Sequence, residues 1–106
     1  MLGIALKEPN LKSLAFLSKS LGDENRLRII LSLENGKKSV SQIVEELNLS
    51  QPLVSHHLKE LRRSLLVTVE RQGPFIYYGM SDRRVINILQ DLEGLARDLL
   101  SDRKTF

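Results

Sequence analysis

Apolar residues follow a helical spacing through the first part of the chain and change to an alternating pattern only past its middle. Leucines recur every three or four positions over residues 11–21, which predicts a helix ended by Gly22. A second helix is expected to begin after the cap residue Asp23 and to run to about Glu34. Gly36 is expected to give it a left-handed end. Its inward-facing residues are expected to be Leu27, Ile30, Leu31 and Leu33.

Two short helices are predicted in the middle of the chain. Ser39 is followed three residues later by Gln42, a spacing typical of a capping box at the start of a third helix. The apolar face of this helix consists of Val40, Ile43, Val44 and Leu47. A tight turn at residues 48–49 separates it from a fourth helix, which Ser50 caps and which runs over residues 51–63. The pair predicts a helix-turn-helix.

The apolar pattern then takes a period of two. This predicts strands over residues 66–72 and 75–80, joined by a hairpin tip at Gly73-Pro74. A last helix is expected from about Ser81-Asp82 to Ser101. The order of elements predicts a mainly α fold, a winged helix-turn-helix with about five helices and a two-stranded wing. The expected organisation is one domain over 1–106, with a reading unit at about 39–64, a wing at about 66–80, and dimerisation helices at about 11–21 and 82–101.

The fourth helix combines an apolar face with a polar one. Val54, Leu58 and Leu61 are spaced to anchor it inward. The residues predicted to contact DNA are Ser50, Gln51, Ser55, His56, Lys59 and Arg62 on this helix, and Arg71, Gln72 and Gly73 on the wing. Glutamine can pair with adenine, and basic side chains suit phosphates and the minor groove. The alternative is an ordinary solvated surface, but a hairpin directly after the helix favours DNA contact.

Three segments of the sequence resemble the ArsR family of winged-helix repressors. They are LGDENRLRII at 21–30, LSQPLVSHHLKELR at 49–62 and FIYY at 75–78, within a similarity that covers about residues 11–100. The resemblance implies a dimer built from the first and last helices, and repression relieved by an effector. Related sequences usually carry glycine where the recognition helix ends, whereas this chain has Leu65. The helix therefore either ends in a different cap or runs slightly longer.

The last helix carries more apolar surface than one small core can cover, which supports dimerisation independently. The residues predicted to form the dimer interface are Leu11, Leu14, Leu17, Val85, Leu89, Leu92, Leu95 and Leu99. A twofold dimer would place its recognition helices about one DNA turn apart and read an inverted repeat. The alternative is a last helix packed wholly against its own domain.

The metal ligands of many family members are missing from this chain. It has no cysteine, and Ser39-Val40-Ser41 stands where those members carry Cys-Val-Cys, so a thiophilic metal is excluded there. The family's zinc-site positions are occupied by Asp82, Arg84, Leu95 and Asp98, without histidine. The adjacent His56 and His57 point about 100° apart on a helix and cannot easily chelate together, and the family pattern makes His57 structural. We therefore expect no metal and no cofactor.

Composition restricts the function classes further. The net charge is +3 and the pI about 9.5, which suits a protein that meets phosphate on one face. No secretory signal or membrane-length apolar run is seen, so a cytoplasmic location is expected. The sequence contains neither a nucleophile elbow nor a phosphate-binding loop, so we do not expect an enzyme. The leading hypothesis is a homodimeric repressor of double-stranded DNA sites, whose effector is a small organic molecule, a hard ion or nothing at all. The alternative is a winged-helix module that binds another protein.

Overall fold

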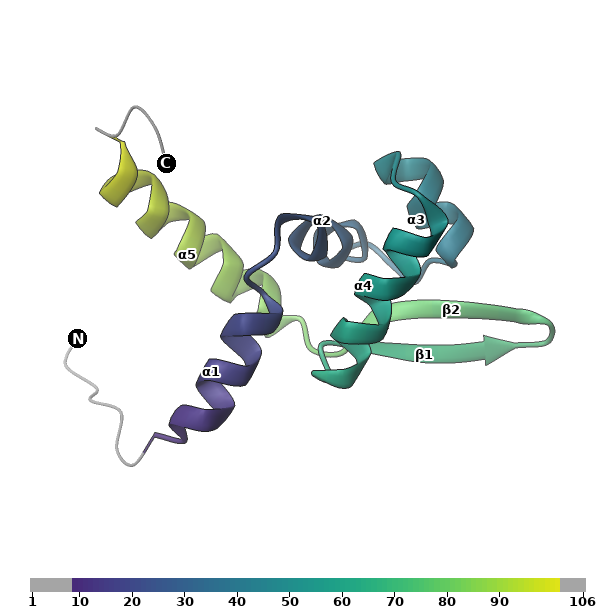
Figure 1. Ribbon diagram of the computed structural model, residues 1–106, viewed down its shortest axis with the longest axis horizontal. Helices are drawn as coiled ribbons and strands as arrows, with labels where there is room; N and C mark the ends of the chain where they lie inside the picture. Colours follow the sequence, from purple (N-terminus) through teal and green to yellow (C-terminus); the bar gives the residue numbers. More distant parts are fainter. Residues whose placement is uncertain (1–8, 102–106) are drawn as a thin grey trace.

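A computed structural model describes residues 9–101 of the chain (Figure 1). The elements are α1 (Leu11–Ser20), α2 (Glu24–Ser32), α3 (Val40–Leu47), α4 (Gln51–Arg63), β1 (Val67–Gln72), β2 (Phe75–Met80) and α5 (Arg84–Leu100). The two strands form one antiparallel hairpin between α4 and α5. The predicted winged helix-turn-helix is therefore confirmed.

The core lies between α2, α3, α4 and the base of the hairpin. Its buried residues are Ile29, Ile30, Leu33, Ile43, Val54, Leu58, Leu61, Leu66, Val67 and Val85. The three inward positions predicted for α4 are thus confirmed. On α2 the prediction was wrong at two positions, because Leu31, expected to face inward, is 48% exposed, whereas Ile29, which was not predicted, is fully buried. A continuous apolar run fits more than one helical face, and packing against α4 selects among them.

The end of α2 also differs from the expectation. The helix ends at Ser32, and its cap residue Leu33 has an ordinary negative φ of −92°. Gly36 has a positive φ of 142°, but it lies in the loop beyond the cap. The left-handed glycine therefore serves the loop and does not end the helix.

The turn of the helix-turn-helix is closed by local hydrogen bonds. Ser39 and Gln42 form the predicted capping box at the start of α3. Asn48 ends that helix in the left-handed conformation, with φ 56° and ψ 46°, which asparagine tolerates better than most residues. The Ser50 hydroxyl then accepts the Leu53 N–H at 3.3 Å and caps α4. These caps fix where α4 begins.

The hairpin is anchored at its base and projects away from the helices at its tip (Figure 1). Val67 pairs with Met80 at the base and Gln72 with Phe75 at the tip. A further pair of backbone hydrogen bonds joins Lys38 and Tyr78, at 2.9 and 2.7 Å. The loop before α3 therefore holds the wing beside the reading unit.

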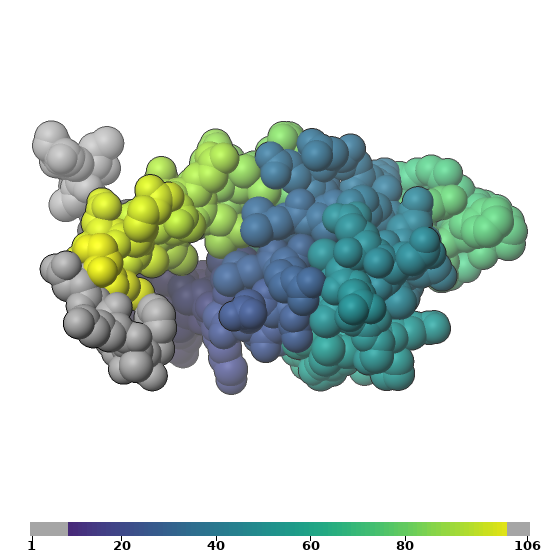
Figure 2. All heavy atoms as spheres, turned by 90° about the horizontal axis from the view of Figure 1, so that it is seen from above, coloured from purple at the N-terminus to yellow at the C-terminus, as the bar shows by residue number. Residues whose placement is uncertain are grey.

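The helices α1 and α5 extend on the side of the core opposite the hairpin tip (Figures 1 and 2). No residue of α1 is buried, and α5 buries only Val85 and Ile86. The radius of gyration is 15.8 Å, whereas a compact domain of 100 residues has about 13 Å. No helix within residues 9–101 is long and apolar enough to cross a membrane.

Candidate nucleic-acid interface

The exposed face of α4 presents a narrow stripe of polar side chains. Successive residues on an α-helix are about 100° apart, so spacings of four, four and three residues stay within a sector of about 80°. The residues at these spacings are Gln51, Ser55, Lys59 and Arg62, and all four are exposed. Ser50 and His56 are also exposed beside the stripe. The stripe faces away from the core, so a double helix could reach it.

The basic residues of this surface differ in what they already contact. Arg63 lies 3.5 Å from Glu60 in an ion pair. Lys59, Arg62 and Arg71 form no ion pair with any residue between 9 and 101. Their charges are therefore available to phosphates, and a phosphate contact would not require a protein ion pair to break.

The wing carries its exposed polar residues at the tip. Gly73 has φ 63°, and a β-carbon there would meet nothing, so this position uses the freedom of glycine only for the turn. Arg71 is exposed and paired across the hairpin with Ile76. Gln72 is exposed too, but its amide donates to Glu70, which also pairs with Lys37. Arg71 is therefore the wing residue best placed for a phosphate.

His57 points away from the exposed polar stripe of α4 and is 5% exposed. Its Nδ1 lies 3.4 Å from Arg26 Nη1, and its Nε2 lies 3.7 Å from Asp23 Oδ1. Burial lowers the pKa of His57, and the nearby Asp23 carboxylate opposes part of that effect. The backbone N–H of Arg26 donates a hydrogen bond to the Asp23 carboxylate, and this bond lowers the pKa of that carboxyl. His57 is thus a structural residue that packs α4 against the start of α2.

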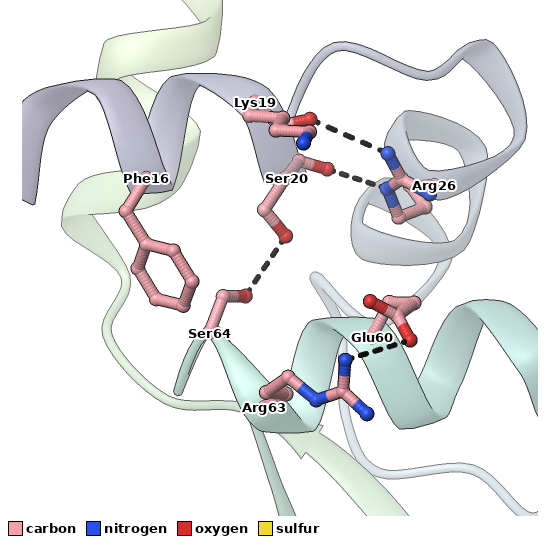
Figure 3. Close-up of a pocket in the computed structure, with 7 residues that line it drawn as sticks. All are labelled: Phe16, Lys19, Ser20, Arg26, Glu60, Arg63 and Ser64. Carbon is pink, nitrogen blue, oxygen red and sulfur yellow. Dashed lines mark hydrogen bonds and ion pairs between the residues drawn. The ribbon is translucent and has the colours of Figure 1, made fainter.

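Arg26 joins three parts of the structure, a role that the sequence did not reveal (Figure 3). Its Nε donates to the Ser20 carbonyl at 2.6 Å and its Nη2 to the Lys19 carbonyl at 3.3 Å, which satisfies the end of α1. The Ser20 and Ser64 hydroxyls are 2.9 Å apart beside it. A pocket of about 240 Å³ lies at this junction, lined by Phe16, Lys19, Ser20, Arg26, Glu60, Arg63 and Ser64. The last turn of α1 and the end of the recognition helix are therefore linked.

Leu65, which stands where related sequences carry glycine, belongs to the cap that ends α4. The Leu65 N–H donates to the Arg62 carbonyl at 3.0 Å, and the Leu66 N–H donates to the Leu61 carbonyl at 2.9 Å. These two bonds form a Schellman motif, in which the residue after the cap adopts a left-handed conformation. Leu65 has φ 65° accordingly. The helix ends in a different cap and does not run longer.

Most residues predicted for a dimer interface are exposed along α1 and α5. The exposed ones are Leu11, Leu14, Leu17, Leu92, Leu95 and Leu99. Leu89 is partly buried against the core, and Val85 is fully part of it. Val85 is only 7% exposed in the single chain, because the first turn of α5 packs against the core. Exposed Phe16, Leu65 and Ile88 were not among the predicted residues.

The residues at the family's zinc-site positions either pair with one another or are exposed to solvent. The Arg84 guanidinium and the Arg84 backbone N–H donate hydrogen bonds to Asp82, which lower the pKa of its carboxyl to about 2. Leu95 and Asp98 are exposed further along α5. No group of three or more His, Cys, Asp or Glu side chains that could hold a metal ion occurs between residues 9 and 101.

Comparison with known proteins places this fold among bacterial regulators. Residues 23–69 match the family described as bacterial regulatory protein, arsR family. An HTH-type transcriptional regulator of Methanocaldococcus jannaschii, MJ1325, is 37% identical over 82 residues, which are 76% of this chain and 92% of that protein. The HTH-type transcriptional repressor SmtB of Mycobacterium tuberculosis is 36% identical over 71% of this chain. The aligned part spans only 56% of SmtB.

A solved structure agrees with these sequence matches. HlyU from Vibrio cholerae superposes with a TM-score of 0.72 at 31% identity, covering 81% of this chain and 97% of that one. HlyU of that organism is described as a transcriptional activator. These relatives are regulators of transcription and not enzymes.

Proposed function

Because the chain belongs to the arsR family of bacterial regulatory proteins, we propose that this DNA-binding transcriptional regulator is a homodimeric repressor of an inverted-repeat operator. The observation that carries the proposal is the exposed stripe on α4, with three basic side chains there and on the wing that are not neutralised within residues 9–101. In this account α4 enters the major groove and the wing tip reaches the adjacent backbone.

The residues of the stripe divide into two roles. Gln51 and Ser55 lie in the N-terminal half of α4, the part of a recognition helix that contacts base edges in other helix-turn-helix proteins. A glutamine amide can bond adenine bidentately, and a serine hydroxyl can serve donor or acceptor edges. Lys59, Arg62 and Arg71 would bind phosphates and set the position of the protein on the duplex.

Dimerisation is supported by α1 and α5, because a single protomer buries few of their apolar residues. The ten residues of α1 include none that is buried, and isolated helices of that length are marginal in water. Exposed leucines on α1 and α5 would find apolar partners in a second copy. A twofold arrangement would then present two recognition helices to two half-sites.

Repression is favoured over activation by the description of SmtB, although HlyU is described as an activator. A thiophilic metal effector does not fit a chain without cysteine. An organic molecule, a hard ion or the absence of any effector all fit the residues present. An organic molecule would bind in the clefts beside α1.

The experiment that tests the proposal is selection of random duplexes by the purified protein, followed by sedimentation of the complexes. Enrichment of an inverted repeat that carries two protomers would support it. If nothing were enriched and binding stayed weak and insensitive to salt, the proposal would be wrong. The chain would then act as a winged-helix module for a protein partner.

A further inference from the structure

Leu65 adopts a backbone conformation that its side chain makes unfavourable. Its φ is 65°, in the left-handed region, where the β-carbon crowds the following carbonyl oxygen. Elsewhere within residues 9–101, positive φ values occur only at Asn48, Gly36 and Gly73. Glycine and asparagine are the residue types that tolerate this region, so the turn itself does not require a leucine.

The Leu65 side chain gains little in return within its own protomer, because it is 78% exposed. Burial of a leucine is favourable only when its apolar surface leaves water. In the isolated protomer the side chain of Leu65 thus gains too little burial to offset the strain of its backbone. Backbone strain of this kind persists where another interaction compensates it.

The surroundings of Leu65 indicate what that interaction is. Leu65 lines an apolar groove of about 380 Å³ together with Leu17 of α1 and Val85 and Ile88 of α5. Leu17 and Ile88 are themselves exposed. The groove therefore connects the exposed apolar residues of α1 to those of α5 through the end of the recognition helix.

We propose that Leu65 is a contact of the subunit interface, where it packs against a second copy of the chain and ties the end of α4 to the geometry of the dimer. The inference rests on the proposed homodimer. A second copy fits better than a small ligand, because α1 has no buried residue along its whole length and a ligand in the groove would leave its leucines exposed.

The position of Leu65 gives this contact a consequence for DNA binding. Leu65 follows directly after Ser64, which caps the recognition helix. A partner surface pressed against Leu65 would hold the end of α4 and fix the angle at which the two recognition helices meet DNA. Loss of the contact should therefore weaken binding to an inverted repeat more than binding to a single half-site.

Three substitutions of Leu65 distinguish the effect of its backbone strain from the effect of its contact with the second copy. Leu65→Gly and Leu65→Asn relieve the backbone and remove the apolar side chain, whereas Leu65→Met keeps an apolar side chain of similar size. We expect Leu65→Gly to raise the dimer dissociation constant at least about tenfold, measured by sedimentation equilibrium. Leu65→Asn should behave like Leu65→Gly. Leu65→Met should stay within about threefold of the natural protein.

Protomer stability supplies the second readout. It is measured by urea unfolding in a Leu92→Glu background, in which an exposed leucine of α5 carries a charge and dimerisation is suppressed. There Leu65→Gly should stabilise the fold about fivefold to thirtyfold in the unfolding equilibrium, because the left-handed strain is gone. Weaker dimers with more stable protomers would support a contact role, which no effect confined to the protomer can produce.

Two results would overturn the inference, and they differ from each other. If the natural protein is a dimer and Leu65→Gly dimerises equally well, or destabilises the monomeric background, Leu65 is not an interface contact and the proposed function stands. If the natural protein is monomeric on its selected DNA, the proposed dimer and the inference fail together.

Discussion

The hydroxyl oxygens of Ser20 and Ser64 lie 2.9 Å apart, and this bond joins the last residue of α1 to the cap of the recognition helix (Figure 3). Ser64 also donates to the Leu61 carbonyl at 3.0 Å, so Ser20 is the donor to Ser64. Ser64 is buried and Ser20 is partly buried. A side-chain bond between residues 44 positions apart thus connects α1 to α4.

We expect Ser64→Ala to lower the free energy of unfolding by about 1–2 kcal/mol, because the buried hydroxyl loses its hydrogen bonds with Ser20 and with the Leu61 carbonyl. The double variant Ser20→Ala/Ser64→Ala should lose less free energy of unfolding than the sum of the two single losses. We expect the difference, measured by urea unfolding, to be about 0.5–1.5 kcal/mol. Exposed Ser13 supplies the control, and Ser13→Ala should add to Ser64→Ala without coupling. Full additivity of the Ser20 and Ser64 variants would mean that the bond contributes nothing to stability.

Gln51→Ala should relax base preference without removing DNA binding. The Gln51 amide is exposed at the first position of α4, where a base contact is expected, and a good bidentate pair is worth about 1–3 kcal/mol of discrimination. The measurement is a comparison of affinities for the selected duplex and single-base variants of it. Gln42→Ala on α3 is the matched control and should leave the preferences unchanged, at some cost in helix capping. Unaltered preferences in Gln51→Ala would place the reading face elsewhere.

Stability should fall between neutral and mildly acidic pH because of His57. Burial lowers its pKa below the ordinary 6.5, so the unfolded chain binds more protons and stability decreases as the pH falls through 6.5 toward the lowered value. The lowered pKa of Asp23 acts in the same direction, but only below its ordinary 3.8. Urea unfolding at several pH values should show this slope in the natural protein and in His56→Gln. The slope should shrink in His57→Gln, and a slope that survives there must arise from another group.

A charge on the outer apolar face should separate the dimer. Leu14 on α1 and Leu31 on α2 are similarly exposed, at 47% and 48%, but only Leu14 belongs to the predicted interface. Leu14→Glu should produce monomers in sedimentation equilibrium and lower the helix content, since α1 would then lack packing partners. Leu31→Glu should leave the dimer intact. Equal effects from both variants would contradict this placement of the interface.

Local patterns predicted the parts of the fold that local interactions decide. The capping box of Ser39 and Gln42, the tight turn at residues 48–49 and the glycine tip of the wing each involve residues no more than four apart. The buried face of α4 was also readable, because its apolar residues occur at one helical spacing only. These features fixed the helix-turn-helix and the position of its polar stripe.

Contacts between distant segments could not be predicted in the same way. The inward face of α2 was ambiguous within an unbroken apolar run, and packing against α4 buried Ile29 and exposed Leu31. The Arg26 contacts with α1 and His57 bring together residues up to 31 positions apart. The helical spacing of Val85 did not reveal that the start of α5 packs it against the core of its own protomer. The structure was needed to distinguish these cases.

The most direct test of the DNA interface is the salt dependence of binding to the selected duplex. Lys59, Arg62 and Arg71 form no ion pair within residues 9–101, and these three cations in each of two protomers predict a slope of log affinity against log salt of about −5. Lys59→Ala or Arg71→Ala should make it shallower by about two for a dimer, and weaken binding to every sequence alike. Arg97→Ala on α5, where the arginine pairs with Glu93, should leave it unchanged. A slope near zero, or one that neither Lys59→Ala nor Arg71→Ala alters, would contradict the proposed interface.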